Sequence, residues 1–192
     1  MKTIKAWYFS GADKKLRYGD ERKIKIGVTH KFEGNPVLCE CGLHGSIKPL
    51  YALQYAPGPV VWRVELSGEM DVGANKIAAA ERKYLWGYDA TNILRAFVRK
   101  CALDVVPLWN APEIVIKYLK MGDESIRAAA SDAAWDAAWD AAGTAAWAAA
   151  WDAAWATAWA AARATARAAA GTAVREKQNT RLYRMLMDGR KK

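Results

Sequence analysis

The sequence has little cysteine and histidine, and it lacks the short motifs that mark common catalytic and nucleotide-binding sites. Three cysteines and two histidines occur in 192 residues, and such an odd, sparse set is typical of a reducing compartment. No glycine-rich phosphate loop, dinucleotide-binding fingerprint, zinc-protease motif or serine-hydrolase elbow is present. The sequence therefore predicts no catalytic residue, no metal site and no cofactor, and it favours a protein that is not an enzyme.

Long apolar runs free of charge are also missing. The first 15 residues contain no apolar stretch of the length that a signal peptide needs. The alanine-rich stretch after residue 128 is interrupted by Asp132, Asp136, Asp140 and Asp152, which argues against a transmembrane helix. We therefore expect a cytoplasmic protein without a membrane partner.

Acidic residues are outnumbered by basic ones. The chain has 29 Lys and Arg against 20 Asp and Glu, a formal net charge of +9. The excess lies toward the two ends, in residues 1–34 and 125–192. This balance favours an anionic partner such as a small molecule of the nucleotide type, a nucleic acid or an acidic protein. A merely solvated basic surface explains it equally well.

Residues 1–88 are predicted to form a small α+β domain with an antiparallel or mixed sheet. Strand patterns lie at residues 3–9, 23–32, 37–41 and 60–66, of which the last is the strongest. In the second of these, Ile24, Ile26 and Val28 are expected on one buried face. A short helix is expected over residues 48–56, beginning near Pro49. Residues 76–86 fit a strand, although their alanines also favour a helix.

Residues 89–122 are predicted to form two helices that pack on this domain. Asp89 or Thr91 can cap the first helix, and Pro107 ends it. Asn110 precedes the second helix, and Gly122 is suited to its C-terminal cap. The fold class predicted for the chain is therefore α+β, with a long helical tail after it.

Residues 123–192 are predicted to be a long helical tail. Proline is absent after Pro112, and 27 of the 47 residues between 128 and 174 are alanine, the strongest helix former. A Trp, Gly or Arg recurs at every fourth position. Four residues turn a helix by about 400°, so this stripe drifts by about 40° per repeat, and one straight partner helix cannot cover it.

We expect the repeat to be an interface, because uncovered tryptophans would create a large apolar surface. Self-association into a homo-oligomer is the leading prediction; packing on the N-terminal domain and binding of a foreign partner are the alternatives. The tail either is covered by several helices or folds back near Gly143. The predicted interface residues are Trp135, Trp139, Gly143, Trp147, Trp151, Trp155 and Trp159.

Cys39, Cys41 and His44 are close enough in sequence to suggest a metal site. They offer three soft ligands, but their spacing is not that of a zinc knuckle, and no fourth ligand is evident. The alternative is a short strand with reduced thiols and a loop histidine. This alternative is the interpretation we adopt, so no metal ligand is predicted.

Three segments resemble a group of uncharacterised phage and prophage proteins. They are LCECGLH at residues 38–44, CALDVVPLWNAPEIVIKYL at residues 101–119 and GDESIRAAA at residues 122–130, followed by an alanine-rich four-residue repeat. The resemblance implies an N-terminal domain of unknown function and a phage-related origin. It also implies that the protein acts in the cytoplasm of an infected bacterium.

Residues 42–66 are similar to the middle of the ADP-ribosyltransferase fold. The likeness runs through GLHGS at residues 42–46, YALQYA at residues 51–56 and VVWRVEL at residues 60–66. It implies a nucleotide-binding domain, or a transferase that acts on a host target and depends on His44 and Glu65. With the tail arginines added, the candidate ligand-binding residues are His44, Ser46, Tyr51, Tyr55, Arg63, Arg163 and Arg167.

The leading functional prediction combines these observations. We expect a non-enzymatic phage accessory protein that self-associates through its repeat and binds a host factor or a nucleotide-type ligand. Counter-defence by sequestering a signalling nucleotide of the host is the expected role. The alternatives are an ADP-ribosyltransferase-like enzyme and a nucleic-acid-binding protein whose arginines Arg163 and Arg167 contact phosphates.

Overall fold

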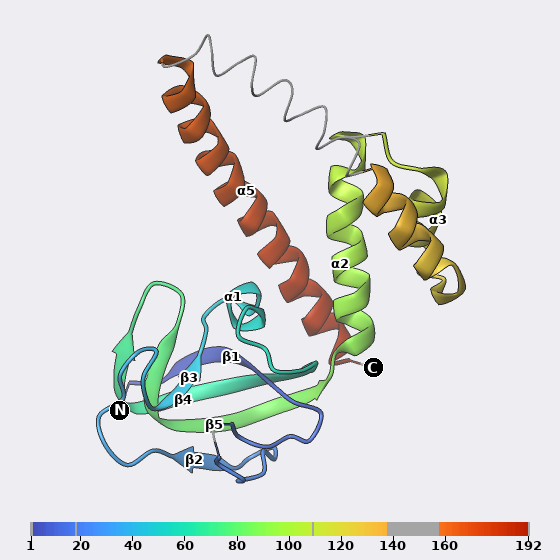
Figure 1. Cartoon of the computed structure of the whole chain (residues 1–192). Helices are drawn as coiled ribbons and strands as arrows, with labels where there is room; N and C mark the ends of the chain where they lie inside the picture. The colour runs from blue at the N-terminus through green and yellow to red at the C-terminus, as the bar shows by residue number, and fades with distance from the viewer. Residues whose placement is uncertain (1, 18, 109, 138–157, 192) are drawn as a thin grey trace. The chain divides into compact units, whose positions relative to one another are not determined.

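The computed structural model describes residues 2–17, 19–108, 110–137 and 158–191, with the backbone alone for Val105, Leu108 and residues 158–170 (Figure 1). The chain divides into two compact units. One consists of Met1–Leu94 together with Gln178–Lys192, and the other of Arg95–Lys177. The end of the predicted tail therefore belongs to the same unit as the N-terminal domain.

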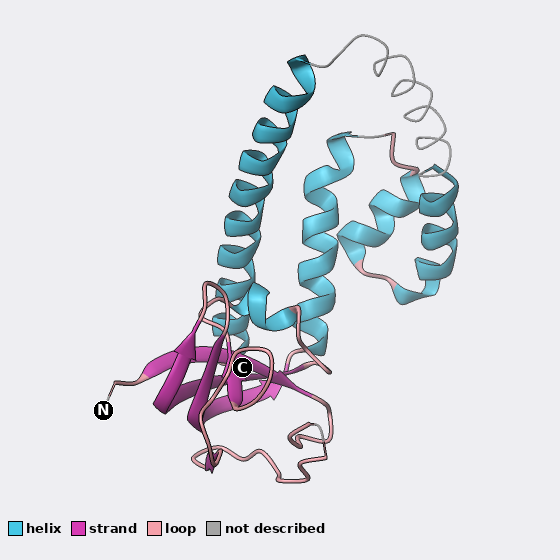
Figure 2. Cartoon of the chain, turned by 60° about the vertical axis from the view of Figure 1, so that its left-hand side comes forward, coloured by secondary structure: helices cyan, strands magenta, loops and turns pink. Residues whose placement is uncertain are grey.

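The first unit is built on a five-stranded antiparallel sheet, which confirms the predicted α+β class (Figure 2). Its strands are β1 (Ile4–Ser10), β2 (Thr29–Lys31), β3 (Leu43–Gly45), β4 (Val60–Val72) and β5 (Ile77–Asp89). Their order is β1-β4-β5-β2, and β3 also pairs with β5. All these pairs are antiparallel.

The β4–β5 hairpin forms the centre of the sheet. The predicted strand at residues 60–66 is confirmed and extends to Val72, and residues 76–86 form a strand despite their alanines. A bulge interrupts the register between Arg63 and Val64. Because a bulge shifts the alternation of side chains, Tyr84 shares one face with Val64, and Trp86 lies on the other face against Trp7.

Two predicted strands are wrong in whole or in part. Of residues 23–32, only Thr29–Lys31 is strand, and Ile26 is 63% exposed although Ile24 is buried. Gly27 explains this, because its φ of +84° is a left-handed conformation that ends the alternation. Residues 37–41 form a turn, in which the Cys41 amide donates to the Val37 carbonyl at 3.1 Å.

Among the described residues, helices occur where the sequence predicts them. They are α1 (Pro49–Leu53), α2 (Thr91–Val105), α3 (Glu113–Met121), a helix at residues 127–137 and α5 (Ala158–Gly189). Asp89 caps α2 by accepting a hydrogen bond from the Thr91 amide, and Gly122 ends α3 at φ +70°. None of the described helices combines the length and the hydropathy that a membrane crossing needs.

The predicted tryptophan interface lies mostly outside the described residues. Trp135 is the described exception: it belongs to the helix at residues 127–137 and is 71% exposed. The structure does not describe Trp139, Gly143, Trp147, Trp151 and Trp155, nor the side chain of Trp159.

Candidate ligand-binding cavity

A cavity of about 550 Å³ lies in the first unit. Its walls come from β1, from the loop between β1 and β2, from residues 39–46, from the end of α1 and from β5. These segments are far apart in the sequence, and the sheet brings them together. The volume is in the range of cavities that hold small molecules.

Arg82 of β5 is the principal charged group in the cavity wall. It is only 3% exposed, and its guanidinium carbon lies 3.8 Å from the centre of the Tyr8 ring. Its Nε donates to the Tyr84 hydroxyl at 2.9 Å, and its Nη1 donates to the His44 carbonyl at 2.6 Å. Within the described part of the chain, no carboxylate forms an ion pair with Arg82. A fixed positive charge therefore lines the cavity. The guanidinium has five N–H donors, and these two hydrogen bonds use two of them.

His44 lines the same cavity and is held by its own turn. Its Nδ1 lies 3.1 Å from the Gly42 carbonyl, and its buried Nε2 has no hydrogen-bond partner among the described residues. Burial, and then the charge of Lys76, hold the pKa of His44 below its usual range. The ring is therefore neutral near pH 7, and Nδ1 carries the proton that is donated to Gly42.

Basic groups also outnumber acidic ones around the cavity. Arg17, Arg22 and Lys76 line it together with Arg82, whereas the acidic lining residues are Asp20 and Glu40. Arg22 already pairs with Asp20 at 2.6 Å, and this bond lowers the pKa of the Asp20 carboxyl. The remaining potential is positive and suits an anionic ligand.

Aromatic side chains form much of the remaining wall. Tyr8, Phe32 and Tyr55 line the cavity together with Trp7 and Phe9. Tyr55 is 56% exposed, and the Nζ of Lys76 lies 4.6 Å from its ring centre. An exposed ring beside a cation can receive a flat ligand group and an anion at the same time.

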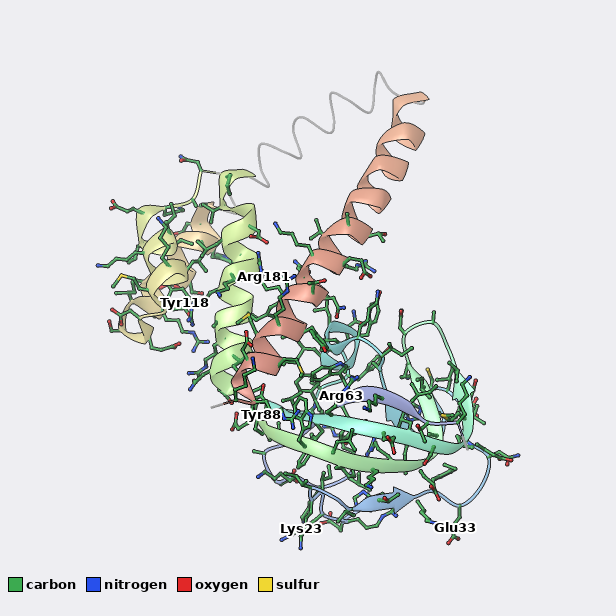
Figure 3. All side chains as sticks on the ribbon, turned by 180° about the vertical axis from the view of Figure 1, so that it is seen from behind. Lys23, Glu33, Arg63, Tyr88, Tyr118 and Arg181 are labelled. Carbon is green, nitrogen blue, oxygen red and sulfur yellow. The ribbon has the colours of Figure 1, made fainter. Side chains whose placement is uncertain are left out.

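The structure brings together only part of the predicted ligand-binding set. His44, Ser46 and Tyr55 line the cavity, whereas Tyr51 and Arg63 do not. Arg63 lies over Trp7, with its guanidinium carbon 4.8 Å from the ring centre, and burial lowers its pKa (Figure 3). The side chains of Arg163 and Arg167 lie outside the described residues.

Sequence reasoning did not single out Arg82, Lys76 or Tyr8. The available signal for Arg82 was a charged residue two positions before Tyr84 in a strand whose inward positions are otherwise apolar. The bulge that determines which face of the sheet these two side chains occupy could not be predicted from the sequence. Cys39 and Cys41 also line the cavity, but among the described residues no group of three His, Cys, Asp or Glu is arranged to hold a metal ion.

Comparison with known proteins adds one similarity. No curated protein and no solved structure matches the chain. One family model does match: residues 8–96, from β1 to the start of α2, which include every residue that lines the cavity except Trp7. A domain of unknown function, DUF7666, therefore covers residues 8–96.

Proposed function

We propose that the cavity binds a nucleotide-type anionic ligand and that the protein works by binding rather than by catalysis. The observation that carries this proposal is Arg82, a buried cation in the cavity wall with no carboxylate partner among the residues that the structure describes. A buried charge is costly unless it is paired. A phosphate group would supply the missing anion and would match the planar guanidinium geometrically.

The aromatic residues of the cavity wall support the other part of a nucleotide-type ligand, its planar base. A base offers a flat face that stacks on tyrosine or phenylalanine, and the pairing of Tyr55 with Lys76 places a ring and a cation side by side. A free inorganic anion would make no use of these rings. The combination therefore favours a ligand that carries both a phosphate and a planar ring.

The test is equilibrium binding of ADP-ribose, cyclic nucleotides and nucleoside phosphates to the full chain by calorimetry. We expect at least one of them to bind. Lys76→Gln and Tyr55→Ala should each weaken that ligand roughly tenfold, because each removes about 1.5 kcal/mol of interaction. Lys83→Gln is the matched control, because Lys83 is an exposed β5 residue outside the cavity lining. Absence of binding to every compound at high micromolar concentration would refute the proposal.

The biological role that we propose is that of a phage accessory protein acting in the cytoplasm of an infected bacterium. There it would sequester a signalling nucleotide of the host. The support is the resemblance of the sequence to phage and prophage proteins, together with the positive, aromatic cavity. Sequestration needs affinity and abundance but no catalytic group.

Self-association through the tryptophan repeat is a separate part of the proposal. We expect the full chain to have a molar mass in solution that is a multiple of 21.2 kDa. A Trp147/Trp151/Trp155→Ala variant should shift toward the monomer, because three large aromatic side chains are removed from the interface. Light scattering after size exclusion measures both. A monomeric wild-type protein at micromolar concentration would contradict this part alone.

A further inference from the structure

The face of the sheet that carries Trp7, Trp86 and Tyr88 is covered by the C-terminal part of α5. Leu182 and Leu186 are completely buried, and Gly189 packs against Tyr88. The Tyr88 hydroxyl donates to the Leu186 carbonyl at 2.5 Å, and burial raises the pKa of Tyr88 to about 12, so the hydroxyl keeps its proton. Residues 178–189 are therefore a structural layer of the unit, although they lie outside the part that the family model matches.

This helix contacts one cavity wall directly. Tyr183 meets Trp7 edge to face, with ring centres 5.7 Å apart. Trp7 is 1% exposed and lines the cavity. Its amide donates to the Ser46 carbonyl at 2.7 Å, and the Ser46 amide donates back at 2.9 Å. A shift of Tyr183 would therefore change the position of Ser46 through Trp7, and Ser46 also lines the cavity.

A second connection runs from the helix to α1. The Leu50 amide, in the first turn of α1, donates to Oδ1 of Asn179 at 3.2 Å. Lys48, the N-cap residue of α1, makes no capping hydrogen bond with its side chain. Asn179 thus satisfies one of the amides that a helix start leaves without a partner. Ala52 of α1 and Tyr55 just after it line the cavity.

From these two connections, we propose that residues 178–189 hold the cavity walls in place, so that docking of this helix and ligand binding strengthen each other. Two elements that meet the ligand, β1 and α1, are tied to a helix that does not line the cavity. Any ligand that binds only the assembled walls must also stabilise the docked helix, because coupling between two binding equilibria is reciprocal. The ligand half of this coupling rests on the function proposed above.

The test begins without ligand, by amide hydrogen exchange of the full chain. An Asn179→Ala/Tyr183→Ala variant should exchange the amides of Trp7, Ser46 and Ala52 about tenfold faster than wild type, because local opening becomes easier. The Gly27 amide, which donates to the Tyr84 carbonyl at 2.8 Å and lies outside the cavity lining, should be unchanged. Arg184→Ala is the matched control, since Arg184 is exposed on the same helix.

The second measurement adds the tightest-binding nucleotide. We expect it to slow exchange in residues 178–189 of the wild type and to bind the double variant roughly tenfold more weakly. Unchanged exchange of Trp7, Ser46 and Ala52 in the double variant would overturn the inference, whatever the nucleotide does. Equal acceleration of the Gly27 amide would overturn it too, because the helix would then support only global stability. If the walls loosen as expected but the wild type binds no nucleotide, the proposed function fails and the structural inference stands.

Discussion

Gly87→Ala should lower the free energy of unfolding by about 3 kcal/mol, the largest effect that we expect from removing or adding a single methyl group. A Cβ atom at this position would lie 2.2 Å from a ring carbon of Trp62, its register partner on β4. The ring is held on two sides, since its Nε1 donates to Ser10 Oγ at 2.9 Å and it packs edge to face with Tyr84, with ring centres 5.5 Å apart. Denaturant unfolding followed by circular dichroism measures the loss.

Gly171→Ala is the matched control for this substitution. A Cβ atom at Gly171 meets no atom of the described residues within 4 Å apart from the backbone of its own helix, and the residue lies inside α5. The control should stabilise its helix by up to about 1 kcal/mol, because alanine is the better helix former. If the Gly87→Ala variant were as stable as wild type, the close packing of β4 on β5 at Trp62 would be wrong.

Arg82→Gln should weaken the tightest-binding nucleotide by roughly 10- to 150-fold, because a hydrogen bond to a charged group contributes about 1.5–3 kcal/mol. No other cavity residue combines full burial with a positive charge. Calorimetric titration of the purified variant provides the affinity, and its circular dichroism spectrum shows whether the sheet is intact. The size of the loss in affinity, compared with that of a charge-removing variant outside the cavity, distinguishes a specific contact from a general effect of charge.

Two further variants separate charge from geometry at this position. Arg82→Lys keeps the charge but loses the planar fork, so it should recover only part of the affinity. Lys83→Gln removes the same charge one residue away, outside the cavity lining, and should bind like wild type. An Arg82→Gln variant that is folded and binds with unchanged affinity would show that the ligand does not meet this residue.

The sequence predicted the local elements of the fold better than it predicted the site. The strand that begins at Val60 was evident from its β-branched run, and the ends of α2 and α3 were evident from Asp89 and Gly122. These signals act over a few residues. Such local chemistry is what a single sequence displays most clearly.

The cavity depends on contacts that are distant in sequence. Arg82 meets Tyr8 and the carbonyl of His44 only after the hairpin and β3 have paired, and a bulge decides which face it occupies. Gly27 and Cys39 turn the chain where alternation suggested strands. The packing of Leu182 and Leu186 on the sheet could not be read from their spacing either, since amphipathic spacing does not name the partner.

The split of the first unit between residues before 95 and after 177 has a consequence for synthesis on the ribosome. A chain emerges N-terminus first, at about 5–20 residues per second. Synthesis of residues 95–177 therefore separates the sheet from the helix that covers Trp7 and Trp86 by roughly 4–17 s. During this interval, the aromatic face of the nascent sheet is open to chaperones or to neighbouring nascent chains. Translation speed through the alanine-rich codons would then influence how much protein reaches its folded form.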